Sequence, residues 1–109
     1  MDSAVQQYLD ERLSAIERHM GAVADAARFE VELARDVRNQ KTGEIWKAEL
    51  QIRVPGGDYT RVVGTGESIN AAIDAMKDEA LRKLRTRKEA RTSFVRRTGA
   101  LVKKMLRME

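Results

Sequence analysis

The chain has 109 residues, enough for a single domain with a modest hydrophobic core. It contains no cysteine and no apolar run of membrane-spanning length, so we expect no disulfide, no thiolate metal site and no membrane partner. The net charge of +4 is distributed unevenly, because residues 77–109 carry twelve Lys/Arg against four Asp/Glu, whereas residues 1–76 carry nine against thirteen. A positive charge concentrated in this way attracts polyanions such as nucleic acids; a solvated helix face is the alternative interpretation.

The first predicted element is a helix over residues 4–20. Ser3 and Gln6 have the spacing of a capping box, in which a hydroxyl and an amide satisfy free backbone N–H groups. Gly21 is expected to end the helix. The N-terminal residues lack the basic and apolar regions of a signal peptide, so a cytoplasmic location is expected. One face of the helix is apolar at intervals of three and four residues, at Val5, Leu9, Leu13, Ile16 and Met20.

Three predicted strands follow. Residues 29–34 and 46–54 alternate apolar and polar side chains, and residues 59–65 form the third strand. The Pro-Gly-Gly-Asp sequence of residues 55–58 is typical of a tight reversal. Short connections between consecutive strands predict an antiparallel meander. The second strand should turn Trp46, Ala48, Leu50, Ile52 and Val54 toward the core and Lys47, Glu49, Gln51 and Arg53 toward water.

A second helix is predicted after Ser68, whose hydroxyl is the expected N-cap. Its apolar stripe consists of Ile69, Ala72, Ile73, Met76, Ala80 and Leu84. Beyond Leu84 this stripe is interrupted, so the helix either continues into solvent or stops. The predicted fold is α+β, in the order α-β-β-β-α, with two helices packed on one face of a three-stranded antiparallel sheet. We assign residues 1–91 to this domain and residues 92–109 to a basic amphipathic tail whose apolar positions are Phe94, Val95, Leu101, Val102, Met105 and Leu106.

Residues suited to catalysis are scarce in this sequence. Paired acids and bases, a nucleophile motif and a cluster of metal ligands are all lacking, so we expect neither an enzyme nor a cofactor. The single histidine, His19, is interpreted as a helix residue, because it has no partner ligand. The sequence Gly64-Thr65-Gly66 lacks the rest of a phosphate-binding loop and is interpreted as the end of a strand. Trp46 is expected in the core rather than in a base-stacking platform.

The basic residues therefore provide the candidate site. Residues three and four apart share a helix face, which places Arg82, Arg85 and Lys88 in one row and Lys83 and Arg87 in a second. Aromatic residues are not interleaved with them, which favours recognition of structured RNA through its shape and backbone over stacking on single strands. Ion pairs with nearby carboxylates are the alternative. If the two helices pack side by side, the first helix adds two residues, and the predicted RNA-binding set is Arg12, Arg18, Arg82, Lys83, Arg85, Arg87 and Lys88.

The order of the elements and three segments resemble a known family. The segments are residues 5–18 (VQQYLDERLSAIER), 53–57 (RVPGG) and 70–74 (NAAID), the last leading into the basic helix. Over residues 4–91 the chain is similar to short ribosome hibernation-promoting factors, a family also called ribosome-associated inhibitor A. The tail at residues 96–106 resembles C-terminal extensions of some small members.

This resemblance implies a β-α-β-β-β-α fold with the layout of double-stranded RNA-binding domains. It implies a partner, the small ribosomal subunit with its rRNA, contacted by basic residues of both helices in the channel of mRNA and tRNA. Translation would then be inhibited by occlusion, during ribosome hibernation under stress. The family's first strand has no counterpart here, so residues 29–37 should form an unpaired sheet edge, which pairs with another chain or reflects a truncation. Two alternatives are a general structured-RNA binder and a module that forms homodimers through this edge or the tail.

Overall fold

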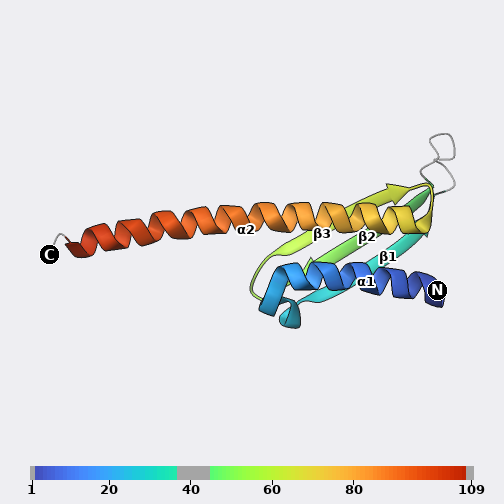
Figure 1. Ribbon diagram of the computed structural model, residues 1–109, viewed down its shortest axis with the longest axis horizontal. Coiled ribbons are helices and arrows are strands. Elements are labelled where there is room, and N and C mark those ends of the chain that lie inside the picture. Colours follow the sequence, from blue (N-terminus) through green and yellow to red (C-terminus); the bar gives the residue numbers. More distant parts are fainter. Residues whose placement is uncertain (1, 37–44, 108–109) are drawn as a thin grey trace.

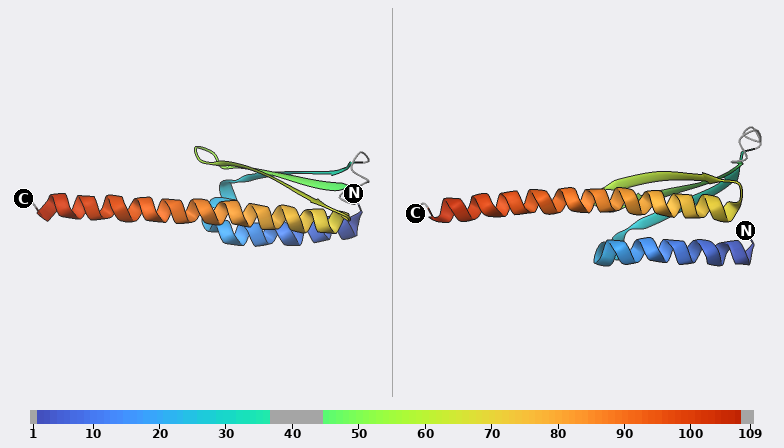
Figure 2. Two further views of the ribbon diagram at one scale, coloured as in Figure 1. Left: turned by 90° about the horizontal axis from the view of Figure 1, so that it is seen from above. Right: turned by 45° about the horizontal axis from the view of Figure 1, so that its top comes forward.

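The computed structural model describes residues 2–36 and 45–107, with side chains as far as residue 88 in the last helix. Three antiparallel strands form one sheet in the order β1-β2-β3. Both helices lie on the same face of this sheet, as the two views of Figure 2 show, which confirms the predicted α+β class. In chain order the elements are α1 (Ser3–Met20), the 3-10 helix η1 (Gly21–Ala26), β1 (Arg28–Arg35), β2 (Trp46–Arg53), β3 (Tyr59–Gly66) and α2 (Ile69–Arg107), labelled in Figure 1 except for η1.

The predicted first helix is confirmed, but its N-cap is Asp2 rather than Ser3. The carboxylate of Asp2 accepts a hydrogen bond of 2.9 Å from the backbone N–H of Ala4. The capping box was therefore wrong: a carboxylate one residue earlier satisfies the free N–H group, and the Gln6 amide donates to Asp10 instead. Gly21 ends α1 with a φ of 70°, as expected, because a left-handed conformation at this position favours glycine.

The core lies between the inner face of the sheet and the two helices. Periodicity identified this face correctly, since β2 buries alternate residues and pairs Leu50 with Val31 of β1 and Val62 of β3. The N-cap of α2 is also confirmed, because the Ser68 hydroxyl accepts from the N–H of Ala71 at 3.1 Å. The buried apolar side chains are Leu9, Ile16, Ala48, Leu50, Ile52, Val62, Ala72, Ile73, Met76 and Ala80, with Trp46 partly buried against them.

The outer face of the sheet is less wet than the alternation of β2 predicted. Lys47 and Arg53 are exposed, but Glu49 is only 8% exposed. Its carboxylate forms an ion pair with Arg61 on β3, and the long side chain of this arginine can cover it. A mid-strand residue of the central strand is screened on both sides by neighbouring strands, which the sequence of one strand cannot reveal.

Helix α2 packs on β3 at the two glycines of the Gly64-Thr65-Gly66 sequence. A Cβ atom at Gly64 would lie 2.2 Å from the backbone nitrogen of Met76 and 2.5 Å from the carbonyl oxygen of Ala72. At Gly66 it would lie 2.8 Å from the backbone nitrogen of Ala72. Gly64 is thus interior to β3 rather than at its end, and both glycines permit the close approach of helix and strand.

The second helix continues far beyond the sheet. It spans 39 residues without a break, through the position of Gly99, so the alternative in which it stops near Leu84 was wrong. Figure 1 shows its C-terminal half projecting away from the domain, which accounts for a longest dimension of 67 Å. The apolar positions predicted for residues 94–106 lie outside the described side chains, and the domain boundary at residue 91 stays a prediction.

Substitution of Gly64 by alanine should destabilise the fold. The new methyl group meets backbone atoms of α2 rather than a flexible side chain, so we expect a loss of about 3 kcal/mol. Urea unfolding monitored by circular dichroism measures this loss. Thr65→Ser is the matched control, because it keeps the hydroxyl of an exposed residue between the two glycines and should change stability by less than about 0.5 kcal/mol. Equal midpoints for the two variants would contradict the close contact.

Candidate nucleic-acid interface

A three-residue cluster joins the two helices. The Tyr8 hydroxyl donates to Oδ2 of Asp74 at 2.6 Å, and Nε of Arg12 donates to Oδ1 at 3.1 Å. The Arg12 guanidinium also lies over the Tyr8 ring, 3.6 Å from its centroid, as a cation–π contact. The hydrogen bond from Tyr8, with further help from Arg12, lowers the pKa of Asp74 and keeps it ionised. The predicted RNA-binding residue Arg12 is therefore engaged within the protein, with 27% of its side chain exposed.

Two other predicted residues are held against the sheet. Arg87 donates to the hydroxyl of Thr60 and, at 3.0 Å, to the carbonyl oxygen of Tyr59. Lys83 donates from Nζ to the carbonyl oxygen of Arg61, also at 3.0 Å. The two residues share a helix face, as predicted, but this face is turned toward β3. Because Thr60 is buried, the hydrogen bond from Arg87 satisfies a hydroxyl that would otherwise be costly to bury.

The remaining four residues point into solvent to different degrees. Arg82 is exposed but bound to Glu79 through two hydrogen bonds of 2.5 and 3.0 Å, which is the ion pair expected as an alternative. Arg18 and Arg85 are exposed, and among the described residues neither has a hydrogen bond or ion pair. Lys88 is also exposed and lines a pocket between the two helices.

The helices run side by side in the same direction (Figure 1). Tyr8 contacts Asp74 near their N-terminal ends, and His19 and Lys88 line one pocket further along. The condition for combining both helices into one site is therefore met. We call the exposed basic residues of this layer, Arg18, Arg82, Arg85 and Lys88, the outer helical surface.

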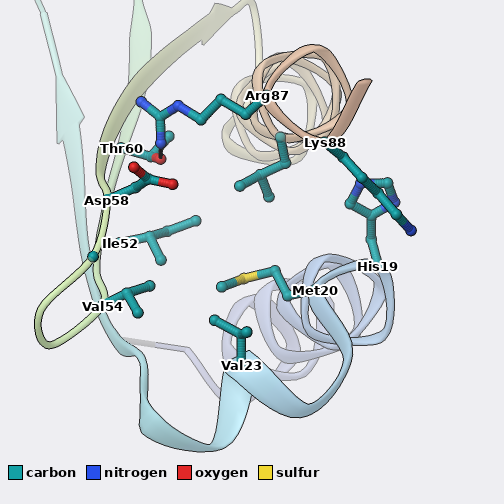
Figure 3. Close-up of a pocket in the computed structure, with 11 residues that line it drawn as sticks. His19, Met20, Val23, Ile52, Val54, Asp58, Thr60, Arg87 and Lys88 are labelled. Carbon is teal, nitrogen blue, oxygen red and sulfur yellow. Dashed lines mark hydrogen bonds between the residues drawn. The ribbon is translucent and has the colours of Figure 1, made fainter. Parts of the chain in front are cut away.

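A pocket with a volume of about 370 Å³ opens beside this surface (Figure 3). The end of α1, η1, the β2–β3 hairpin and α2 all contribute to it. No pattern in the sequence indicates this cavity, because His19 and Lys88 are far apart along the chain and each resembles an ordinary helix residue. His19 and Lys88 come to line the same pocket only when the two helices pack against each other.

The described residues contain no group of three or more His, Asp or Glu side chains that could hold a metal ion. Of the helices in residues 2–36 and 45–107, none combines the length and the apolar character needed to cross a bilayer.

Comparison with known protein families gives a match, which agrees with the fold and with the basic residues of the two helices. Residues 1–92 match the family described as Sigma 54 modulation protein / S30EA ribosomal protein. Since the match covers most of the chain, the protein belongs to this family, a class of ribosome-associated factors linked to hibernation and translation regulation, which confirms the resemblance seen in the sequence. The family is not known as an enzyme family. No curated protein matches the chain.

The contribution of Asp74 to stability should depend on pH. Its pKa is lowered from the ordinary value of 3.8, so the stability that it contributes is present above this value and is lost as the pH falls through the folded-state pKa. We expect Asp74→Asn to lower the melting temperature by a few degrees at pH 7. The difference from the wild type should shrink as the pH falls through this lowered pKa, because the Asp74 carboxylate becomes protonated. Thermal melts from pH 2 to pH 7 test this, and a difference that persists at the lowest pH would contradict it.

Proposed function

We propose that the protein binds the small ribosomal subunit through its rRNA and inhibits translation by occupying the channel used by mRNA and tRNA. The family match over residues 1–92 is the observation that carries this proposal, because it makes the ribosome the partner to consider first. The charge distribution supports RNA as the component contacted, since the net charge of residues 77–109 is strongly positive. The site of action would be the cytoplasm, where ribosomes translate.

The outer helical surface is the proposed contact with rRNA phosphates. Arg18 and Arg85 lead this assignment, since both are exposed and neither is bound to another described residue. Arg82 would exchange its ion pair with Glu79 for a phosphate, at little net cost because exposed ion pairs contribute little. Three of the predicted residues have a supporting role, because their hydrogen bonds within the protein fix the positions of the helices. These residues are Arg12, Lys83 and Arg87.

The projecting part of α2 extends this basic surface. Residues 89–107 contain six Lys/Arg and one Glu, and their backbone continues the helix away from the sheet. A regular helical backbone advances about 5.4 Å per turn, and a rod of this kind suits contact with a rigid, folded RNA. In this proposal the domain docks on the subunit. Residues 89–107 of α2, which we call the helical arm, reach along the channel.

Inhibition needs no chemical step. A folded domain placed in the channel excludes mRNA and tRNA by its volume, and it leaves when the balance of ionic contacts is weakened. Affinity for the subunit should accordingly fall steeply as salt concentration rises, because each phosphate that a cation neutralises releases a counterion.

Charge reversal at two exposed positions tests the assigned surface. The double variant Arg18→Glu/Arg85→Glu should reduce co-sedimentation with purified small subunits by at least about tenfold, because two phosphate contacts become repulsions. The matched control, Arg28→Glu/Arg53→Glu, changes charge equally on the outer face of the sheet. It should bind like the wild type at moderate salt.

Two results would count against this proposal. If both double variants lost affinity equally, net charge rather than the outer helical surface would determine binding. If an unrelated structured RNA displaced the wild-type protein completely, the chain would be a general RNA binder without a shaped ribosomal site.

Self-association is a second candidate, favoured by the edge of the sheet. Within residues 2–36 and 45–107, β1 pairs with β2 on one side and with no strand on the other. An unpaired strand edge offers free backbone groups to another chain. The amphipathic sequence at residues 94–106 offers an alternative contact.

Sedimentation equilibrium distinguishes these two contacts. The wild type is compared with the variant Phe94→Glu/Leu101→Glu at concentrations from about 10 μM to 1 mM, the range of a weak dimer. A dimer that forms in both proteins would point to the β1 edge, and one that the substitutions abolish would point to the helical arm. A monomer throughout would remove this candidate.

A further inference from the structure

We propose that the pocket beside the outer helical surface binds a single unpaired nucleotide, with the base on its apolar floor and the phosphate at its basic mouth. The inference deepens the proposed function and in part rests on it, because one source of such a nucleotide is the bound RNA. The other source is a free mononucleotide, which has the same chemistry.

The floor of the pocket is aliphatic and comes from three parts of the fold. Ile52 at the end of β2 is buried, whereas Val23 on η1 is 48% exposed at the rim. A volume of about 370 Å³ lies within the range typical of small-ligand sites. A flat base would cover this apolar surface and remove it from water. The floor consists of Met20, Ile52, Val54 and Leu84, and Val23 lies at its edge.

The mouth of the pocket has a fixed guanidinium. Arg87 reaches from α2 across to Thr60 on the strand, as Figure 3 shows, and its bonds to Thr60 and to the carbonyl of Tyr59 set its orientation. A guanidinium has five N–H donors, so these two bonds leave others for a ligand. Because its position is already fixed, Arg87 would lose little side-chain entropy on binding a phosphate.

Two further basic groups lie across the pocket from the Arg87 guanidinium. Lys88 on α2 and His19 on α1 lie opposite the sheet in Figure 3. Among the described residues, Asp58 is the one acid that lines the pocket. Basic groups thus outnumber acidic ones, which favours an anionic ligand with an apolar body over a cationic or a purely apolar one.

The single carboxylate already takes part in a contact within the protein, and its remaining acceptor sites give the site a preference among bases. Asp58 lies on the hairpin side of the pocket, close to Thr60 in Figure 3. A carboxylate has acceptor sites for several hydrogen bonds and can accept one from an exocyclic amino group, while it repels the carbonyl oxygen of uracil. We therefore expect cytosine and adenine nucleotides to bind more tightly than uridine nucleotides.

Titration with mononucleotides, followed by NMR chemical shifts of the labelled full chain, tests the proposal. CMP and AMP should shift pocket resonances with a dissociation constant on the order of 0.1 mM, and UMP should bind several-fold more weakly. Val23→Trp fills the pocket at an exposed position and should weaken CMP binding by about tenfold without a change in charge. Lys88→Gln should weaken it by about threefold. The matched control Lys47→Gln, which removes the same charge on β2 outside the pocket, should leave the affinity within twofold.

Binding of the same variants to purified small ribosomal subunits distinguishes the two sources of the nucleotide. If Val23→Trp also weakens binding to small subunits, the pocket takes a nucleotide of the bound RNA. If it weakens only CMP binding, the ligand is a free nucleotide. Inorganic phosphate that produces the same shifts as CMP would overturn the proposal, as would CMP binding that Val23→Trp leaves intact. The pocket proposal would also be overturned if the wild type did not bind CMP and Val23→Trp bound small subunits as tightly as the wild type. The proposed function would still stand in that case, provided that the wild type binds the small subunit.

Discussion

The backbone of α2 approaches β3 so closely that Gly64 and Gly66 have no room for a methyl group. This contact sets the height of the long helix above the sheet, and the rest of the site depends on it. At this height, Lys83 and Arg87 can reach backbone oxygens of β3. A bulkier strand residue would lift the helix, and the bonds that hold these two cations would lengthen or break.

Position around the helix separates the basic residues of α2 into two groups with different tasks. Cations on the sheet side, such as Arg87, satisfy polar groups of the fold and are fixed in place. Cations on the solvent side, such as Arg85, are exposed and available for a partner. The same division exists on α1, where Arg12 binds Asp74 and Arg18 is exposed. The positive charge of the helices therefore includes cations that already have partners within the protein, and these have fewer donors left for a phosphate.

The side-by-side packing of the two helices creates features that neither helix has alone. It places α1 and α2 in one layer, and it forms a pocket where α1 ends beside the middle of α2. An apolar floor next to a basic mouth can distinguish one part of an RNA from another, which charge alone cannot do. In a ribosome-associated factor, such a pocket would add a local contact to the general attraction for phosphate.

The sequence by itself determined the two helices, the three strands, their order and the inward faces of α1, β1, β2 and the first half of α2, because these follow from local periodicity and from caps such as Ser68 and Gly21. It also identified the family and the basic character of α2. It indicated neither η1 nor the full length of α2. Only the tertiary structure decided which charged side chains are bound to partners within the protein. Arg12 and Asp74 are 62 positions apart in the chain, and the burial of Glu49 depends on Arg61 of the neighbouring strand. Such pairs form only when elements pack, because the side-chain pattern of one element does not specify its neighbour's.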